Sequence, residues 1–196
     1  MAVRVEGALE LRKALLKFSP DLAKEMRVEM TAAVKPVAKE AKSFISTRVL
    51  TNWARKSETT KFPYFDYRAA KGGIGYKVSP SKPNRQGFVS LAQIRNKSAS
   101  GAIFETAGRK NPNGQPWNPK SGSKKFSRSN NPNAGRDFIA ALNNVSPLIG
   151  RGNERGRAIY RAWENDKGAA QDGVFRALEN AALKFEERVK RGNIQR

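Results

Sequence analysis

The chain has 196 residues, a formal net charge of +21 at pH 7 and an apolar fraction of 38%, which is low for a globular domain. It contains no cysteine and no histidine, which excludes disulfides, thiolate nucleophiles and imidazole bases and removes the commonest ligands of transition metals. The positive charge favours attraction to nucleic acid, anionic membranes or acidic proteins, without choosing between them.

The length fits a single domain spanning 1–196. The first residues lack the apolar core of a signal peptide, and no apolar run approaches the roughly 20 residues that a membrane span needs. We therefore expect a protein that folds in a cytoplasm and does not enter a membrane.

Residues 1–50 predict helices. Leucines at helical spacing indicate a short helix over 8–17, and Ser19 and Pro20 form a restart signal, with Ser19 as the N-cap. Apolar residues then recur every three or four positions from about 20 to about 48, which predicts a long amphipathic helix. Pro36 lies inside this helix and predicts a kink, because it removes one backbone donor.

Residues 51–72 lose this period and are rich in aromatic side chains. One interpretation is a loop whose rings fold back on the core. The other is an arm that buries the rings against a neighbouring chain, because aromatic residues dominate the cores of interfaces. The candidate interface residues in this arm are Trp53, Phe62, Tyr64, Phe65 and Tyr67.

Residues 73–107 predict a small antiparallel sheet. Ile74, Tyr76 and Val78 alternate with polar or small residues, residues 88–94 favour strand, and a short apolar segment at 101–108 is expected to pair with them. The links between these segments are rich in Pro, Asn and Ser, which favours turns.

Residues 108–152 predict a long basic loop region that ends in a short helix between Asp137 and Leu148. Loops of this length without periodic apolar residues are usually functional or disordered. Three uses remain open for it, namely contact with DNA phosphates, docking to an acidic protein, or simple solvation. The candidate contact residues are Arg109, Lys110, Lys120, Lys124, Lys125, Arg128 and Arg136.

Residues 153–196 predict C-terminal helices, the last with an apolar stripe from Val174 to Val189. The expected fold class is therefore α+β. A long kinked N-terminal helix and a C-terminal amphipathic helix would pack on a small antiparallel sheet, with an extended aromatic arm and a long basic loop.

No pattern in the sequence predicts catalysis, a metal site or a cofactor. The acids of the central region are Asp66, Glu105 and Asp137, which are far apart, whereas a metal-dependent nuclease needs clustered carboxylates. The glycines near 72–75 do not have the spacing of a phosphate-binding loop. We therefore expect no enzyme activity and no small-molecule substrate.

Glu105 is the single acid among fourteen basic side chains between Tyr67 and Arg136. It lies in the least polar part of that stretch, which suggests a fixed structural pairing. The partner could be a nearby arginine of the same chain or a basic residue of a second subunit, and both alternatives stay open.

Four segments together resemble a known family, namely 7–15, 20–26, 101–108 (Gly-Ala-Ile-Phe-Glu-Thr-Ala-Gly) and 157–163 (Arg-Ala-Ile-Tyr-Arg-Ala-Trp). The pattern resembles the head-to-tail connector proteins of long-tailed bacteriophages, also called neck or tail-completion proteins, in the form seen in actinobacterial phages. Glu105 and Gly108 match the acid–glycine pair of that family.

The resemblance implies a structural virion protein at the head–tail junction, assembled in the host cytoplasm. Its members form rings, commonly hexameric, between the portal and the tail tube, and genome DNA passes through the ring. The implied partners are copies of the same chain, adjacent connector and tail proteins, and DNA without sequence readout. The alternative is a nonspecific nucleic-acid-binding protein that uses the 109–136 loop.

Overall fold

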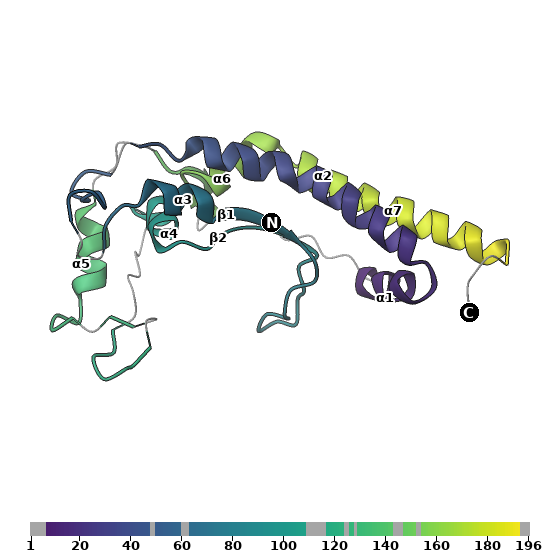
Figure 1. Cartoon of the computed structure of the whole chain (residues 1–196), viewed down its shortest axis with the longest axis horizontal. Helices are drawn as coiled ribbons and strands as arrows, with labels where there is room; N and C mark the ends of the chain where they lie inside the picture. Colours follow the sequence, from purple (N-terminus) through teal and green to yellow (C-terminus); the bar gives the residue numbers. More distant parts are fainter. Residues whose placement is uncertain are drawn as a thin grey trace. The chain divides into compact units, whose positions relative to one another are not determined.

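The structure is a computed structural model that describes residues 7–47, 50–59, 63–108, 117–123, 126–127, 129–142, 147–151 and 154–192. These residues form helices and two antiparallel two-stranded sheets, which confirms the α+β class (Figure 1). The elements are α1 (Ala8–Phe18), α2 (Pro20–Phe44), α3 (Tyr67–Gly73), β1 (Ile74–Val78), β2 (Ala92–Asn96), α4 (Ala99–Thr106), α5 (Ala134–Ala141), β3 (Ile149–Arg151), β4 (Glu154–Gly156), α6 (Ile159–Asp166) and α7 (Ala169–Lys190).

The chain divides into two compact units. Unit 1 comprises Met1–Val37, Tyr76–Ile94 and Asp166–Arg196, and unit 2 comprises Ala38–Gly75 and Arg95–Asn165. Helix α2 and the β1–β2 sheet contribute residues to both units, and the expectation of a single domain stays a prediction.

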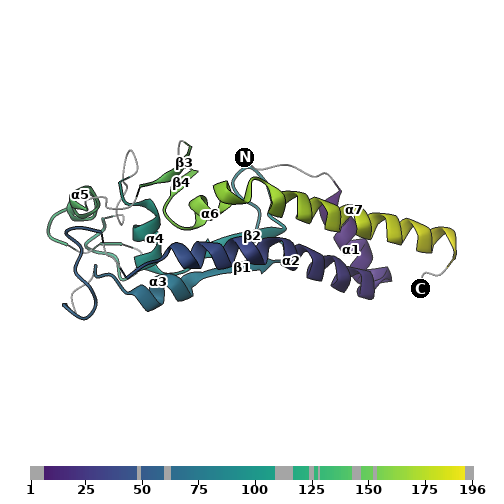
Figure 2. The same cartoon turned by 90° about the horizontal axis from the view of Figure 1, so that it is seen from above.

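Unit 1 is built on α1, the N-terminal part of α2, and α7. Helices α2 and α7 lie side by side, as two perpendicular views show (Figure 1, Figure 2). Their apolar stripes meet α1 and the strands in one buried core, which follows from the three- and four-residue spacing of the sequence. The buried members of this core are Ala8, Leu15, Leu22, Ala23, Met26, Met30, Val34, Val78, Ala177, Leu178 and Ala181.

A ladder of polar pairs runs along the exposed edge of the α2–α7 contact. Asp21 accepts both guanidinium hydrogen bonds of Arg188, at 2.8 and 2.5 Å. One turn along each helix, Lys184 donates to Glu25, and one turn further Asn180 donates to Glu29 at 3.2 Å. The rungs repeat every four residues because that spacing returns side chains to the same face of a helix.

The structure confirms the predicted helices of this unit. Helix α1 matches the expected 8–17 segment, and α2 begins at Pro20 and contains Pro36. The predicted side-chain cap is wrong, because the buried hydroxyl of Ser19 finds no hydrogen-bond partner among the described residues. The carbonyl of Ser19 instead accepts from the Ala23 N–H at 3.1 Å, so Ser19 joins the helix through its backbone.

Unit 2 packs shorter elements around the C-terminal end of α2. Helix α6 contacts that end of α2, where Arg161 lies over the Phe44 ring at 4.0 Å from its centroid and Asn165 donates to Glu40 at 2.7 Å. Helix α3 packs against α4. Its N-terminus is capped by Asp66, which accepts from the Ala69 N–H at 2.9 Å.

The aromatic segment folds back into unit 2. Trp53 and Phe65 are 4% and 3% exposed, and their ring centroids lie 5.1 Å apart. Phe65 continues the cluster to Phe104 at 5.9 Å, and Trp53 meets Phe138 at 6.3 Å. For these rings, the interpretation of a loop that folds back on the core describes the structure.

The segment 101–108 is helical up to Thr106, where α4 ends, and is not the strand that the sequence predicted. The Ser98 hydroxyl caps α4 by accepting from the Gly101 N–H at 2.9 Å. The residues of α4 that are buried are Ser100, Gly101, Phe104 and Glu105, which is helical spacing. The apolar pair Ile103-Phe104 alone was too short to distinguish this period from that of a strand.

Smaller differences concern element bounds. The strand expected over 88–94 is β2 at Ala92–Asn96, and the helix expected between Asp137 and Leu148 is α5 at Ala134–Ala141. The hairpin β3–β4, with Ile149 opposite Gly156, was not predicted because its strands have three residues each. No helix within the described ranges is both long and apolar enough to cross a membrane.

Candidate functional site

The distinctive site of unit 2 is a buried carboxylate at the start of a helix. Glu105, on α4, is 6% exposed. Its Oε2 accepts from the backbone N–H groups of Ala158 and Ile159 at 2.8 and 3.1 Å, and its Oε1 accepts from Tyr160 at 2.9 Å. These donors open α6, so Glu105 satisfies the N–H groups that a helix leaves unpaired at its N-terminus. The negative charge also lies at the positive end of the helix dipole.

Arg157 makes the reciprocal connection from the α6 side. Its side chain is almost fully buried, at 1% exposure. Its Nη1 donates to the carbonyl oxygens of Phe104 and Ala107 at 2.9 and 2.7 Å. Phe104 lies in the last turn of α4 and Ala107 is the C-cap, and carbonyls at a helix C-terminus have no partner inside their own helix. We call Glu105, Gly156, Arg157 and the N–H groups of residues 158–160 the Glu105 clasp.

Gly156 is part of the clasp because the Glu105 carboxylate occupies the space where a side chain at position 156 would lie. A Cβ atom at Gly156 would lie 2.0 Å from Glu105 Oε1 and 2.9 Å from Tyr160 Cδ2. Gly108, which follows α4, has φ +84°, a left-handed conformation that favours glycine. Geometry therefore favours glycine at both positions, beside the Glu105 carboxylate at 156 and just after α4 at 108.

The clasp joins two of the segments that carry the family resemblance. Glu105 and Ala158 are 53 positions apart in the chain, and they come from the 101–108 and 157–163 segments. No local pattern in the sequence predicts this pairing, so Arg157 and Gly156 were not among the expected site residues. The two expected pairings of Glu105 both had a basic side chain as partner, whereas the observed donors are backbone N–H groups of the same chain.

The other two central acids also have structural partners. Asp66 accepts from Lys56 at 2.8 Å, and this hydrogen bond, together with that from Ala69, holds the pKa of the Asp66 carboxyl below its usual value. Asp137 accepts from Asn131 at 3.2 Å. Over the part of the chain that the structure describes, no three acidic side chains gather in a group that could hold a metal ion. The chemistry of this site is therefore that of a backbone clamp.

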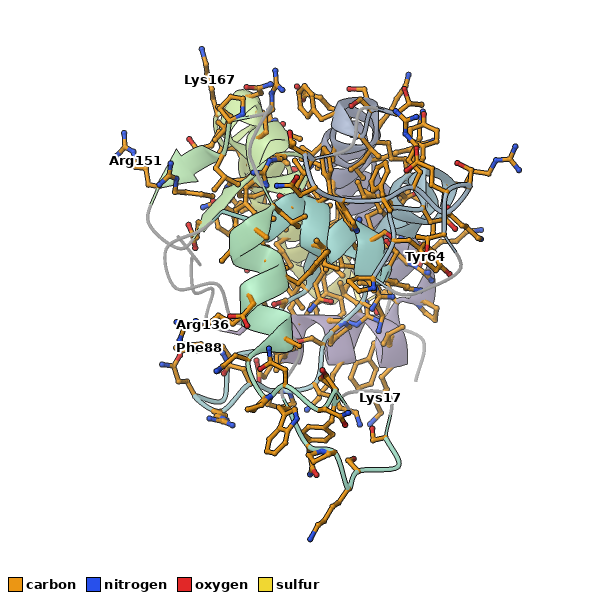
Figure 3. The ribbon with its side chains drawn as sticks, turned by 90° about the vertical axis from the view of Figure 1, so that its left-hand side faces the viewer. Lys17, Tyr64, Phe88, Arg136, Arg151 and Lys167 are labelled. Atoms are coloured by element: carbon orange, nitrogen blue, oxygen red, sulfur yellow. The ribbon has the colours of Figure 1, made fainter. Side chains whose placement is uncertain are left out.

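The predicted arm residues separate into two groups. Trp53 and Phe65 lie in the aromatic cluster, whereas Tyr64 and Tyr67 are half-buried. The Tyr64 carbonyl accepts from the Ser100 hydroxyl at 2.9 Å, which ties the arm to α4 (Figure 3). Phe62 lies outside the described residues.

The predicted basic contact residues are partly described. Lys120 is exposed, and Arg136 is exposed on α5 (Figure 3). In the same loop region, Trp117 donates from its indole to the Ser129 carbonyl at 2.8 Å and stays 45% exposed. This aromatic side chain therefore links the loop to itself. The remaining predicted contacts, which lie outside the described residues, are Arg109, Lys110, Lys124, Lys125 and Arg128.

Comparisons with models of protein families, with curated proteins and with solved structures found no match to this chain.

Proposed function

We propose that this chain is a structural virion protein, a ring subunit of the head-to-tail connector of a long-tailed bacteriophage. In this role it joins the portal side of the capsid to the tail tube and lets genome DNA pass, without catalysis or a cofactor. The ring is a homo-oligomer, with a hexamer favoured, and it contacts adjacent connector and tail proteins at the head–tail junction.

The observation that carries this proposal is the contact between the segments 101–108 and 157–163. Both were singled out by the resemblance, and they meet through Glu105 and Arg157. Glu105 accepts three backbone N–H groups, so the acid that stands out in the sequence serves to hold two helices together. This structural use of the acid–glycine segment fits a protein that has a structural and not a catalytic role.

Exposed apolar side chains on the helices of unit 1 give a second argument. Val28 on α2 and Leu183 on α7 are each 60% exposed, and Leu16 and Val189 are 53% and 49% exposed. An isolated exposed leucine needs no explanation, but several on one helical unit favour surfaces that become buried on assembly. A low apolar fraction is also tolerable in a subunit that buries part of its surface only in a ring.

The test is the mass of the purified full chain, measured by light scattering across a range of concentrations, with particle imaging of the same sample. The expected result is a closed oligomer whose images show a ring. Mass spectrometry of purified virions should detect the chain in stoichiometric amounts with the other connector proteins. A chain that stays monomeric at every concentration and is absent from virions would contradict the proposal.

A further inference from the structure

Unit 1 carries a hairpin between β1 and β2 whose residues 79–90 take no part in the buried core of that unit. Beyond the end of β1 the chain runs out and returns to the start of β2, and this extension projects away from the α2–α7 pair (Figure 1). We call residues 76–94 the basic hairpin. Its cations are Lys77, Lys82 and Arg85, all exposed, and it contains no acidic residue.

The tip of the basic hairpin is held by its own hydrogen bonds. Asn84 Oδ1 accepts from the N–H groups of Gln86 and Phe88 at 2.9 Å each, and the Asn84 N–H donates to the Phe88 carbonyl at 2.9 Å. Gly87 takes φ +80° to close the turn. Further back, the Ser81 N–H donates to the Ser90 carbonyl at 2.9 Å. The tip is therefore ordered before any partner binds, which lowers the entropic cost of binding.

The same turn presents a cation and an aromatic ring together. Arg85 and Phe88 lie within the turn that Asn84 organises, and Phe88 is 48% exposed (Figure 3). Tyr76, at the base of the hairpin, is 40% exposed. Cations that contact phosphates and rings that stack on bases are the combination by which proteins bind single strands. A carboxylate would engage the cations but has no aromatic face to stack on the ring.

We propose that the basic hairpin is a nucleic-acid-binding element, in which Lys82 and Arg85 contact phosphates and Phe88 stacks on an unpaired base. It is separate from the 109–136 loop, and its binding does not require that the chain be a connector subunit. These contacts are to the phosphate backbone and to the face of a base, so the binding should not depend on nucleotide sequence.

The experiment measures fluorescence anisotropy of labelled oligonucleotides of about 20 nucleotides, longer than the stretch that a small element covers. The full chain is titrated into a single strand and into its duplex at salt concentrations from about 50 to about 300 mM. The test variant is Lys82→Gln/Arg85→Gln. The matched control is Lys24→Gln/Lys35→Gln, which removes the same charge from exposed positions on α2 of the same unit.

For the single strand, each lost phosphate contact lowers the salt slope by about 0.7 and the affinity at 50 mM salt by about eightfold. The hairpin variant should therefore lower the slope by about 1.4 and bind roughly 60-fold more weakly, while the control changes affinity by less than about threefold. Phe88→Ala should weaken single-strand binding about fivefold or more, leave the salt slope unchanged and leave duplex binding unchanged.

Equal losses in the hairpin and control variants would overturn the proposal, because binding would then follow net charge alone. Unchanged single-strand affinity in Phe88→Ala would overturn the stacking contact. Titration with polyglutamate tests whether the hairpin binds acidic proteins instead of nucleic acid. If the hairpin variant loses polyglutamate binding and keeps nucleic-acid binding, the hairpin is a docking element for acidic proteins and the proposal is wrong. Because all the substituted side chains are exposed, far-ultraviolet circular dichroism should be the same for every variant.

Discussion

Replacing Glu105 by glutamine tests whether the clasp holds unit 2 together. The substitution keeps the size of the side chain and one acceptor oxygen, but it removes the charge and puts an N–H donor where the second oxygen was. If the amide oxygen keeps the N–H groups of Ala158 and Ile159, the new amide N–H faces the Tyr160 N–H. Two donors then meet in a site where the side chain is 6% exposed.

The expected loss follows from the groups involved. A hydrogen bond to a charged acceptor contributes about 1.5–3 kcal/mol, and an unsatisfied buried donor costs about 1–3 kcal/mol. The charge at the helix N-terminus contributes a further 0.3–2 kcal/mol, roughly. Since these effects overlap, we expect Glu105→Gln to lower the free energy of unfolding of unit 2 by about 2–4 kcal/mol.

The tryptophans provide a probe that is specific for this unit. The chain has three, Trp53, Trp117 and Trp163, and all of them belong to unit 2. Tryptophan fluorescence in urea therefore follows unit 2, while far-ultraviolet circular dichroism follows the helices of both units. At a slope near 2 kcal/mol/M, the fluorescence midpoint should fall by about 1–2 M.

The matched control is Glu164→Gln, which makes the same chemical change at an exposed position of α6. It should change the free energy of unfolding by less than about 0.5 kcal/mol. If Glu105→Gln lowers the free energy of unfolding no more than this control does, the carboxylate does not hold the start of α6 and the reasoning fails. A mild effect on folding together with loss of the oligomer would instead place Glu105 in a subunit contact.

Three further results are expected. Gly156→Ala should destabilise unit 2 by about 1–3 kcal/mol in the same fluorescence assay, because its Cβ would overlap the clasp. The control Gly72→Ala, whose Cβ would meet nothing within 4 Å, should leave the midpoint unchanged, and equal midpoint shifts in the two variants would contradict the steric argument. Arg188 lowers the pKa of Asp21 to about 2, so the stability from this pair is complete above the unfolded value of 3.8 and is lost as pH falls toward 2. The melting temperatures of wild type and Asp21→Asn should therefore differ at pH 5 and converge near pH 2, and a difference that does not depend on pH would contradict this. Leu183→Lys should leave the free energy of unfolding unchanged within about 0.5 kcal/mol but shift the mass measured by light scattering toward that of a monomer. An unchanged mass would mean that Leu183 is not part of the proposed interface.

The sequence alone predicted the long helices because their signals are local. The spacing of apolar residues in α2 and α7 depends only on the helical period, and Pro20 marks a helix start within one turn. The same reasoning identified Glu105 as exceptional, since the contrast between one acid and fourteen basic neighbours is visible without a fold.

Tertiary structure decided what Glu105 does. Its donors lie 53 to 55 positions away in the chain, and no pattern along the sequence encodes a pairing across that distance. The helical form of α4 was decided in the same way. The eight-residue segment becomes a helix by capping at Ser98 and by packing its Phe104 face against the aromatic cluster. The sequence therefore determined which residue mattered, and only the packing of α4 against the start of α6 determined that it holds a helix end, because a buried carboxylate takes its role from the donors around it.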